Sequence, residues 1–393
     1  MFYTKNPKIL LLTRQFPPDI GGVPNYFYNL VLNLKATDVI VIARLMKDYA
    51  NSDKLLEEKG IRIKRVDYYP SNMNLQISIN WFICMFKMVS TIVKIVNTDK
   101  VDYVVVGQSS IFLTFVVYIV KMITRRPYIL FLHGEEIPQI CLRSNGLRRY
   151  LYCHAFAYFC ISEFTKRRLV KFIGNRKLKI KILSPGVEDR FFDDIDISDI
   201  KKKLKIDGKR VIYTIARLDE RKGQDMVIES LPLVVRTHPE IIYIIGGEGP
   251  RLNYLKDLVE KKFLSDYVRF LGLVSNEEIV YYHHVGEIFI MPNRTLEDGD
   301  TEGFGIVFLE ANAVGNPVIG GRAGGTVHAI VDGITGFLVN SNDLKDIANK
   351  ICWLLENKDK ADEMGRRGRE KVWVGSRWSS IAEEFRGYMV NLV

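Results

Sequence analysis

The most informative part of the chain is Glu302-Gly303-Phe304-Gly305-Ile306-Val307-Phe308-Leu309-Glu310. Its two carboxylates stand eight positions apart, and Gly-Phe-Gly comes directly after the first. The pattern predicts a short apolar helix that begins near Gly305 and ends at Gly315, since glycine accepts the left-handed capping conformation. The apolar residues after Gly315 predict a buried strand.

The start of this expected helix is a candidate anion site. The backbone N–H groups of Gly303, Phe304, Gly305 and Ile306 would point outward at the positive end of the helix dipole, which suits a phosphate. Glu310 would lie more than a turn further in and would accept hydrogen bonds from a sugar hydroxyl. When this stretch is considered alone, an ordinary loop-to-helix junction with a carboxylate at its start explains it equally well.

On both sides of this stretch, short apolar segments alternate with longer amphipathic ones. The expected strands include residues 8–12, 39–42, 101–106, 128–132, 211–216, 241–245, 268–274 and 288–292. This alternation predicts a doubly wound α/β architecture. The chain of 393 residues is long enough for two domains. An acidic segment at 193–199 places the expected boundary near residue 188.

Candidate ligand contacts follow two strands of the first half. Open α/β sheets bind ligands at the carboxyl ends of their strands. Gly21 and Gly22 follow the first strand, where paired glycines would let the backbone approach a ligand closely. His133 follows the strand at 128–132. A tight turn and a surface histidine are the ordinary alternatives.

The second half carries a similar loop with two cations. Arg217 and Lys222 flank the connection after the strand at 211–216. They would suit a diphosphate, arginine as a planar fork and lysine as a point charge. Solvated surface charge is the usual alternative for these residues. Glycine-rich turns at 246–250 and 320–325 would also bring backbone close to a ligand.

The net charge of +10 is unevenly distributed. Residues 1–187 contain 28 basic and 12 acidic residues, whereas the remainder contains 28 basic and 34 acidic residues. A basic first half suggests an anionic partner, such as a membrane surface, a lipid-linked phosphate or a nucleic acid. The alternative is a solubility bias without a partner. No recognisable nucleic-acid motif accompanies the basic half, so nucleic acid is the weakest of these partners.

Two apolar stretches raise the question of a membrane span. The stretch 111–120 is shorter than the ~20 residues that a spanning helix needs. The stretch 79–98 is interrupted by Lys87 and Lys94. Both are predicted to be core helices. An interfacial role for Phe82, Phe86 and Lys87 is the alternative.

The cysteines and the first residues bear on the compartment. Five cysteines are scattered without paired spacing, which suggests a reducing compartment and no zinc site. The first apolar run, residues 9–12, is only four residues long, so no signal peptide is expected. We therefore expect a cytoplasmic protein that is peripheral on the inner face of the cell membrane.

In this order, the loops resemble those of the retaining glycosyltransferases of family 4, which have the GT-B fold and an E-x7-E motif. The resemblance covers nearly the whole chain and is most specific over residues 211–340. The matching positions are Gly21-Gly22, His133-Gly134, Arg217-Leu218, Lys222-Gly223, residues 246–250, Glu302–Glu310 and Gly324-Gly325.

The resemblance implies two Rossmann-like domains that face each other across a cleft. The first, residues 1–188, would bind the acceptor, and a C-terminal helix at 377–393 would pack back on it. The second, residues 189–376, would bind a nucleotide-sugar donor, with UDP- or GDP-sugars the expected donors.

The resemblance also implies roles for individual residues. Arg217 and Lys222 would hold the diphosphate, and Glu310 would bind ribose hydroxyls. Glu302 would contact the donor sugar, and His133 would bind one of its hydroxyls near the reacting centre. The remaining donor contacts would come from the backbone of Gly21, Gly22, Leu273, Gly303, Phe304, Gly305 and Ile306.

The implied reaction is transfer with retention, without a metal, a cofactor or a protein nucleophile. Asp298-Gly299-Asp300 offers an alternative, because a D-x-D pair binds manganese in the other major glycosyltransferase fold; a solvated acidic loop is the preferred interpretation. The sequence departs from the family pattern at two positions. His328 stands where a glutamate is frequent, which leaves donor contacts near that loop open, and Ala216 replaces a frequent glycine.

The resulting hypothesis is a glycosyltransferase that acts on a lipid-linked or glycan acceptor in surface polysaccharide assembly. The first alternative is a soluble enzyme that makes a small glycoside or disaccharide. The second is a non-catalytic protein that binds a nucleotide sugar. The presence of Arg217, Lys222, Glu302 and Glu310 together disfavours the second alternative.

Overall fold

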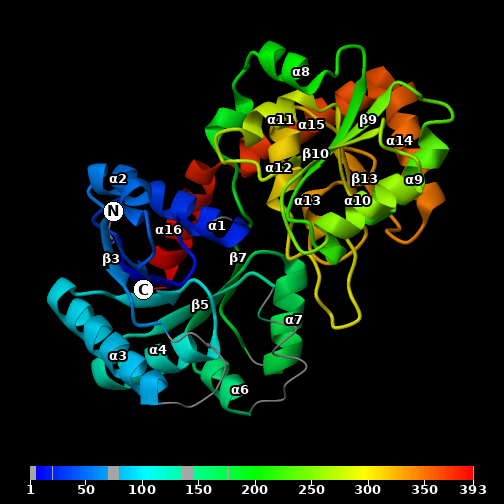
Figure 1. The fold of residues 1–393 in the computed structure, drawn as a ribbon. Coiled ribbons are helices and arrows are strands. Elements are labelled where there is room, and N and C mark those ends of the chain that lie inside the picture. The colour runs from blue at the N-terminus through cyan, green and yellow to red at the C-terminus, as the bar shows by residue number, and fades with distance from the viewer. Residues whose placement is uncertain are drawn as a thin grey trace. The chain divides into compact units, whose positions relative to one another are not determined.

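A computed structural model describes residues 6–392, apart from 20, 70–78, 135, 137–145, 175 and 176. The chain divides into two compact units (Figure 1). Unit 1 comprises Met1–Gly186 and Trp378–Val393, and unit 2 comprises Val187–Arg377. Each unit contains one parallel sheet, so the predicted doubly wound α/β architecture is confirmed.

Unit 1 is built on a seven-stranded parallel sheet in the order β3-β2-β1-β4-β5-β6-β7. Strand β1 lies between β2 and β4; it pairs with β2 from Ile9 opposite Val39 and with β4 from Ile9 opposite Tyr103. The strands are β1 (Ile9–Thr13), β2 (Val39–Arg44), β3 (Arg62–Val66), β4 (Tyr103–Val106), β5 (Tyr128–Leu132), β6 (Ala157–Cys160) and β7 (Ile180–Ile182).

Helices connect these strands. Serines begin two of them: Ser110 accepts a hydrogen bond from the Leu113 amide, and Ser162 accepts one from the Thr165 amide, as good N-caps do. The helices of unit 1 are α1 (Gly22–Leu32), α2 (Tyr49–Glu58), α3 (Ile79–Asp99), α4 (Ile111–Thr124), α6 (Gly146–Cys153), α7 (Glu163–Ile173) and α16 (Trp378–Asn391).

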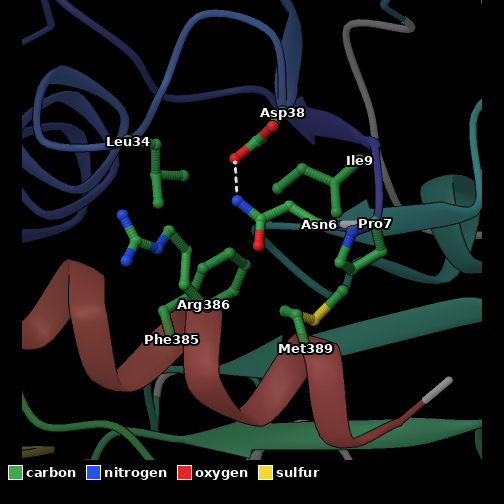
Figure 2. A pocket seen from close by; sticks show the side chains of 8 residues that line it. All are labelled: Asn6, Pro7, Ile9, Leu34, Asp38, Phe385, Arg386 and Met389. Atoms are coloured by element: carbon green, nitrogen blue, oxygen red, sulfur yellow. Dashed lines mark hydrogen bonds between the residues drawn. The ribbon is translucent and has the colours of Figure 1, made fainter. Parts of the chain in front are cut away.

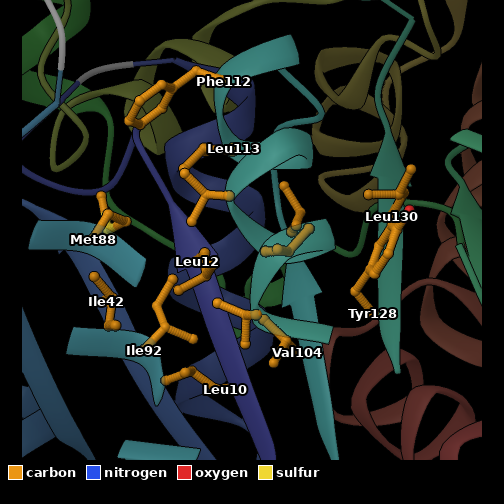
Figure 3. Packing of buried hydrophobic residues seen from close by; sticks show 14 of the residues in the cluster. Leu10, Leu12, Ile42, Met88, Ile92, Val104, Phe112, Leu113, Tyr128 and Leu130 are labelled. Atoms are coloured by element: carbon orange, nitrogen blue, oxygen red, sulfur yellow. The ribbon is translucent and has the colours of Figure 1, made fainter. Parts of the chain in front are cut away.

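Alternate side chains of β1 point to opposite faces of the sheet. Leu10 and Leu12 point into a cluster with Met88 and Ile92 of α3 and with Leu113 of α4 (Figure 3). These side chains are essentially fully buried. Each contributes about 1.5–3 kcal/mol relative to an exposed position, which explains the continuous apolar runs of the central strands.

Helix α16 packs on the other face, although it comes from the end of the chain. Its residues Phe385, Arg386 and Met389 surround a cavity of about 10 Å³ beside Ile9 (Figure 2). At the start of the helix, the Trp378 ring lies 5.1 Å from that of Tyr26 in α1. The last helix therefore completes the core of unit 1.

Helix α3 is long and apolar enough to cross a membrane by length and composition. One of its faces is nevertheless part of the protein core, through residues that include Trp81, Met88 and Ile92. The opposite face is exposed, and its first two turns carry large apolar side chains, with Phe86 74% exposed. The helix therefore combines a core face with an apolar outer surface.

Unit 2 is built on a six-stranded parallel sheet in the order β10-β9-β8-β11-β12-β13. Strands β8 and β9 pair in parallel, from Arg210 of β8 opposite Ile241 of β9. The strands are β8 (Arg210–Ile215), β9 (Ile241–Gly246), β10 (Val268–Gly272), β11 (Ile288–Met291), β12 (Val318–Gly321) and β13 (Gly336–Val339).

The helices of unit 2 cover both faces of this sheet. Ile212 of β8 faces a cluster that contains Val227, Leu231 and Ile351, whereas the ring of its neighbour Tyr213 contacts Phe289. The helices are η1 (Asp189–Phe192), α8 (Ser198–Leu204), η2 (Glu220–Lys222), α9 (Gln224–Val234), α10 (Leu252–Lys261), α11 (Ile279–Val285), α12 (Ile306–Ala313), α13 (Thr326–Ala329), α14 (Leu344–Glu356) and α15 (Lys358–Gly375).

Candidate active site

The candidate donor site of unit 2 is centred on an ion pair between two loops. Lys222 ends η2, which follows β8, and Glu302 lies in the loop between β11 and α12. The Lys222 Nζ atom donates to Glu302 Oε2 at 2.5 Å, and each side chain is only 12% exposed. Arg221 adds a second cation, 3.8 Å from the same carboxylate oxygen.

The ion pair keeps Glu302 ionised in spite of its burial. Burial by itself would raise the pKa of this carboxyl. The charges of Lys222 and Arg221, with hydrogen bonds from Lys222 and from the Phe304 amide, outweigh that effect and lower the pKa of Glu302 below its ordinary value. Glu302 is therefore a fixed negative charge at neutral pH.

A pair of glycines holds the backbone of this loop. The Gly325 amide donates to the Glu302 carbonyl at 2.7 Å. A Cβ atom on Gly324 would lie 2.2 Å from the Glu302 carbonyl oxygen, and one on Gly325 would lie 1.9 Å from that of Gly303. Only glycine allows so close an approach, so this pair fixes the position of Glu302.

Helix α12 begins at Ile306, close to the start near Gly305 that the sequence predicts, and it follows the loop that carries Glu302. Gly305 precedes its first residue, Ile306, and adopts a left-handed conformation with φ of 89°. Its Cβ atom would lie 2.6 Å from the Phe308 ring, so this position also requires glycine. Within the described residues, no side chain caps the helix. The Phe304 amide already donates to Glu302, which the sequence did not indicate.

Glu310 lies one turn further along α12 and is 9% exposed. It faces His283 of α11, with 3.8 Å between Glu310 Oε2 and His283 Nε2. The carboxylate is thus enclosed on the side of α11. Nothing in the sequence pattern connects these two residues.

Arg217 and Leu273 lie on the surface of unit 2. The Arg217 guanidinium is 71% exposed and lies 3.2 Å from Asp219. Leu273 is 56% exposed and follows Gly272, whose φ is 74°. A Cβ atom on Gly247 would lie 2.1 Å from the Ala216 carbonyl oxygen, so the loops after β8 and β9 are in close contact.

In unit 1, Gly21 directly precedes α1 and Gly22 is its first residue. Gly21 has φ of 148°, a conformation that favours glycine, and a Cβ atom on Gly22 would meet nothing within 4 Å. Among the described residues, no side chain caps α1. The backbone at this helix start is therefore open to an approaching group.

His133 follows β5 in the same unit and is buried, with 6% exposure. Its ring packs edge-on against Tyr26 and Phe27 of α1, so α1 and His133 form one local structure. His133 Nε2 lies 3.0 Å from the Gly107 carbonyl oxygen. Because a carbonyl only accepts, Nε2 carries the hydrogen and Nδ1 of the neutral ring is an acceptor.

Burial lowers the pKa of His133 from its usual 6.5 to about 4, although the hydrogen bond to Gly107 acts in the opposite direction. The side chain is therefore neutral at physiological pH. Its backbone N–H donates to Glu136 Oε2 at 3.1 Å. The sequence placed His133 at the strand end but did not indicate this burial.

The D-x-D pair does not form a cluster of ligands. Asp300 lies 3.4 Å from Arg221, and its amide donates to Asp298 at 2.9 Å. Across the described residues, no group of three or more histidine, cysteine or acidic side chains converges as a metal site would require. Cys84, Cys153, Cys160 and Cys352 are free thiols; Cys141 lies outside the described residues.

A cavity larger than the one beside Ile9 lies elsewhere, in unit 2. It has a volume of about 510 Å³ and is lined by residues at the amino ends of β8 and β11, including Arg210, Glu287 and Ile288. None of the sequence-derived candidates lines it. We therefore assign the site from charge and backbone geometry at the carboxyl ends of the strands, where parallel α/β sheets bind ligands.

Two family models match this chain. A model described as glycosyl transferases group 1 matches residues 196–371, and a model described as Glycosyltransferase Family 4 matches residues 20–191. Together they cover most of both units.

Two curated relatives match over nearly their whole length. The GDP-mannose-dependent alpha-(1-6)-phosphatidylinositol monomannoside mannosyltransferase of Mycobacterium tuberculosis is 28% identical over 393 residues, which cover 97% of this chain and 98% of that protein. The protein of the same name from Mycolicibacterium smegmatis is 29% identical over 376 residues, which cover 94% of each chain.

Solved structures share the fold. Anabaena Alr3699/HepE, in complex with UDP and glucose, superposes with a TM-score of 0.79 at 20% identity and covers 98% of this chain and 100% of that one. At this identity the likeness shows the fold alone. From the two family models, the full-length relatives and this fold, the chain is a glycosyltransferase of the group 1 and family 4 type with the two-domain GT-B fold.

Proposed function

We propose that this protein is a retaining, metal-independent hexosyltransferase that transfers a sugar from a nucleoside diphosphate sugar to a lipid-linked acceptor. The observation that carries the proposal is the buried Lys222–Glu302 pair beside the uncapped start of α12. The names of the full-length relatives support GDP-mannose as the donor and a phosphatidylinositol mannoside as the type of acceptor.

Unit 2 would hold the donor. Lys222 has three N–H donors, of which Glu302 takes one at 2.5 Å, so the ammonium can bind a phosphate oxygen without releasing the carboxylate. Arg217 is exposed and would close on the diphosphate with its planar fork. The ionised Glu302 would accept hydrogen bonds from hydroxyls of the donor sugar.

Catalysis would follow from charge that is already in place. As the bond between sugar C1 and the diphosphate oxygen breaks, its electron pair leaves with the diphosphate, and Lys222 and Arg217 stabilise the new charge. The acceptor oxygen bonds to C1 from the same face and passes its proton to a phosphate oxygen. No protein nucleophile takes part in these steps.

Unit 1 would contribute a neutral histidine and an open helix start. Burial keeps His133 uncharged, so it does not repel a developing positive charge on the sugar. The unprotonated Nδ1 atom would accept a hydrogen bond from a sugar hydroxyl, and the backbone of Gly21 and Gly22 would approach the phosphates.

The outer face of α3 supports a peripheral place on an anionic membrane. Ile79, Phe82, Ile83 and Phe86 are each at least 47% exposed on its first two turns. The exposed cations Lys87 and Lys94 follow on the same helix. An apolar stripe beside cations is typical of helices that lie in the interface of an anionic bilayer. This placement would bring unit 1 to a lipid acceptor on the cytoplasmic side.

Arg217→Ala tests the donor site without disturbing the core, because this side chain is 71% exposed. We expect turnover of GDP-mannose to fall by roughly 10²–10³-fold, as when one charge-stabilising donor is removed, with an unchanged melting temperature. Lys358→Ala is the matched control, since Lys358 is 73% exposed and also lies beside one aspartate. Full activity of Arg217→Ala would contradict the site, and an inverted anomeric configuration of the product, read by NMR, would contradict retention.

The lowered pKa of His133 predicts how the stability of unit 1 depends on pH. As pH falls below 6.5, the unfolded chain takes up a proton on His133 that the folded chain takes up only near pH 4, so acid favours unfolding. The full loss is about 3 kcal/mol. The melting temperature should therefore fall more between pH 7 and pH 5 in the wild type than in His133→Gln, which can donate to Gly107 but cannot titrate. Equal shifts would contradict the burial argument.

Replacing Phe82 and Phe86 together with serine tests the membrane surface. Binding to vesicles that contain an anionic phospholipid should weaken at least tenfold, because each buried phenylalanine contributes about 1.5–3 kcal/mol. Phe263→Ser is the control, since Phe263 is 92% exposed in unit 2. If the double variant binds these vesicles as tightly as the wild type does, also at high salt, the proposed membrane surface is contradicted.

A further inference from the structure

Two buried atoms beside the donor site face each other without another hydrogen-bond partner among the described residues. They are Nε2 of His283 in α11 and Oε2 of Glu310 in α12. The distance between them is 3.8 Å. His283 is fully buried and Glu310 is 9% exposed, so little solvent reaches either atom.

The hydrogen bonds behind His283 determine which ring nitrogen carries a hydrogen. The Asn316 Nδ2 atom lies 2.7 Å from the His283 carbonyl oxygen and 2.9 Å from the Tyr213 hydroxyl. A carbonyl only accepts, so this atom is the amide nitrogen and donates to both. Burial raises the pKa of Tyr213 well above its ordinary value, so its hydroxyl keeps its proton.

The Tyr213 hydroxyl therefore accepts from Asn316 and has one hydrogen to give. It lies 2.9 Å from His283 Nδ1, and a donor there makes Nδ1 the acceptor of a neutral ring. The ring hydrogen is then on Nε2, directed at Glu310. A protonated imidazole also carries a hydrogen on Nε2, so this atom is a donor in both charge states.

Aromatic packing fixes the direction of that donor. The Phe289 ring stacks on His283 with 6.0 Å between centroids, and the rings of Phe191 and Tyr213 meet it edge-on at 5.6 and 5.4 Å. Gly286 makes room for Tyr213, since a Cβ atom there would lie 2.0 Å from its ring. The imidazole is thus enclosed on several sides.

We infer that His283 is a positioning residue for the donor. Its Nε2–H holds Oε2 of Glu310, and Oε1 is left to accept hydrogen bonds from the hydroxyls of the donor nucleotide. Closing the present gap to hydrogen-bond length requires a movement of about 1 Å, which a rotation of the Glu310 side chain supplies. This inference rests on the proposed function, because it assumes that Glu310 binds the nucleotide.

A pair of substitutions tests the direction of the contact. In His283→Gln the side-chain amide nitrogen takes the place of Nε2 and can still donate to Glu310. In His283→Asn the amide is one bond shorter; it takes the place of Nδ1 and cannot reach Glu310. Both variants lose the ring and its packing, so their melting temperatures should fall together.

The measurement is the Kd for GDP, and in parallel for UDP, by calorimetry on the full chain. We expect His283→Asn to weaken nucleotide binding about ten- to a hundredfold, as loss of a hydrogen bond to a charged group does. His283→Gln should stay within a few-fold of the wild type, and the KM for the acceptor should change in neither. Equal weakening in both variants, at equal stability, would assign His283 a packing role and overturn the inference.

Glu310→Gln separates this inference from the function on which it rests. If Glu310→Gln weakens nucleotide binding and His283→Asn does not, the positioning role fails and the donor site stands. If Glu310→Gln binds nucleotide as the wild type does, or if the wild type binds neither GDP nor UDP, the proposed donor site fails and the inference fails with it.

Discussion

The buried ion pair of Lys222 and Glu302 is the interaction on which the proposed donor site depends. It joins two loops that are 80 residues apart in the chain. Removing one partner of such a pair typically costs about 3–5 kcal/mol, because the other charge is left buried and unpaired. The pair therefore fixes the loop before α12, and with it the start of that helix, before any substrate arrives.

Glycines make this arrangement sterically feasible. Gly324 and Gly325 contact the backbone of Glu302 and Gly303, and Gly305 allows Phe308 to pack below the start of α12. Each close approach would be blocked by a Cβ atom. The ion pair and the close backbone contacts thus restrict the positions of the same few residues. Electrostatic stabilisation of a leaving diphosphate requires such preorganised groups.

Much of the fold could be predicted from sequence, because parallel strands buried on both faces leave continuous apolar runs. The runs at 8–12 and 241–245 correspond to β1 and β9, and glycine before an apolar pattern marks the start of α12. Strand order across each sheet is a long-range property that no single run encodes.

The candidate site residues could be predicted only in part from the sequence. Residue type and strand-end position selected Lys222 and Glu302 in unit 2 and His133 in unit 1, since each parallel α/β sheet binds ligands at the carboxyl ends of its strands. Spacing could not show that Lys222 pairs with Glu302, that Arg221 reaches the same carboxylate, or that His133 is buried against α1. His283 lies within an ordinary apolar helix pattern, and only tertiary packing reveals its relation to Glu310.

The same packing separates the roles of the two carboxylates. Glu302 is held by cations, whereas Glu310 faces the imidazole of His283, on which aromatic rings pack. A fixed charge suits contact with a sugar whose bond to phosphate is breaking. The inferred contact with His283 would hold one oxygen of Glu310 and leave the other to recognise hydroxyls that do not react.

The most direct test of the central claim is a calorimetric titration of the wild type with GDP, UDP and their sugar conjugates in the presence of EDTA, repeated with manganese. The charges of Lys222, Arg221 and Arg217 are in place without a metal. We expect one nucleoside diphosphate to bind in EDTA, with an affinity that falls as the salt concentration rises. Binding that requires manganese, or binding of no nucleotide under either condition, would contradict it.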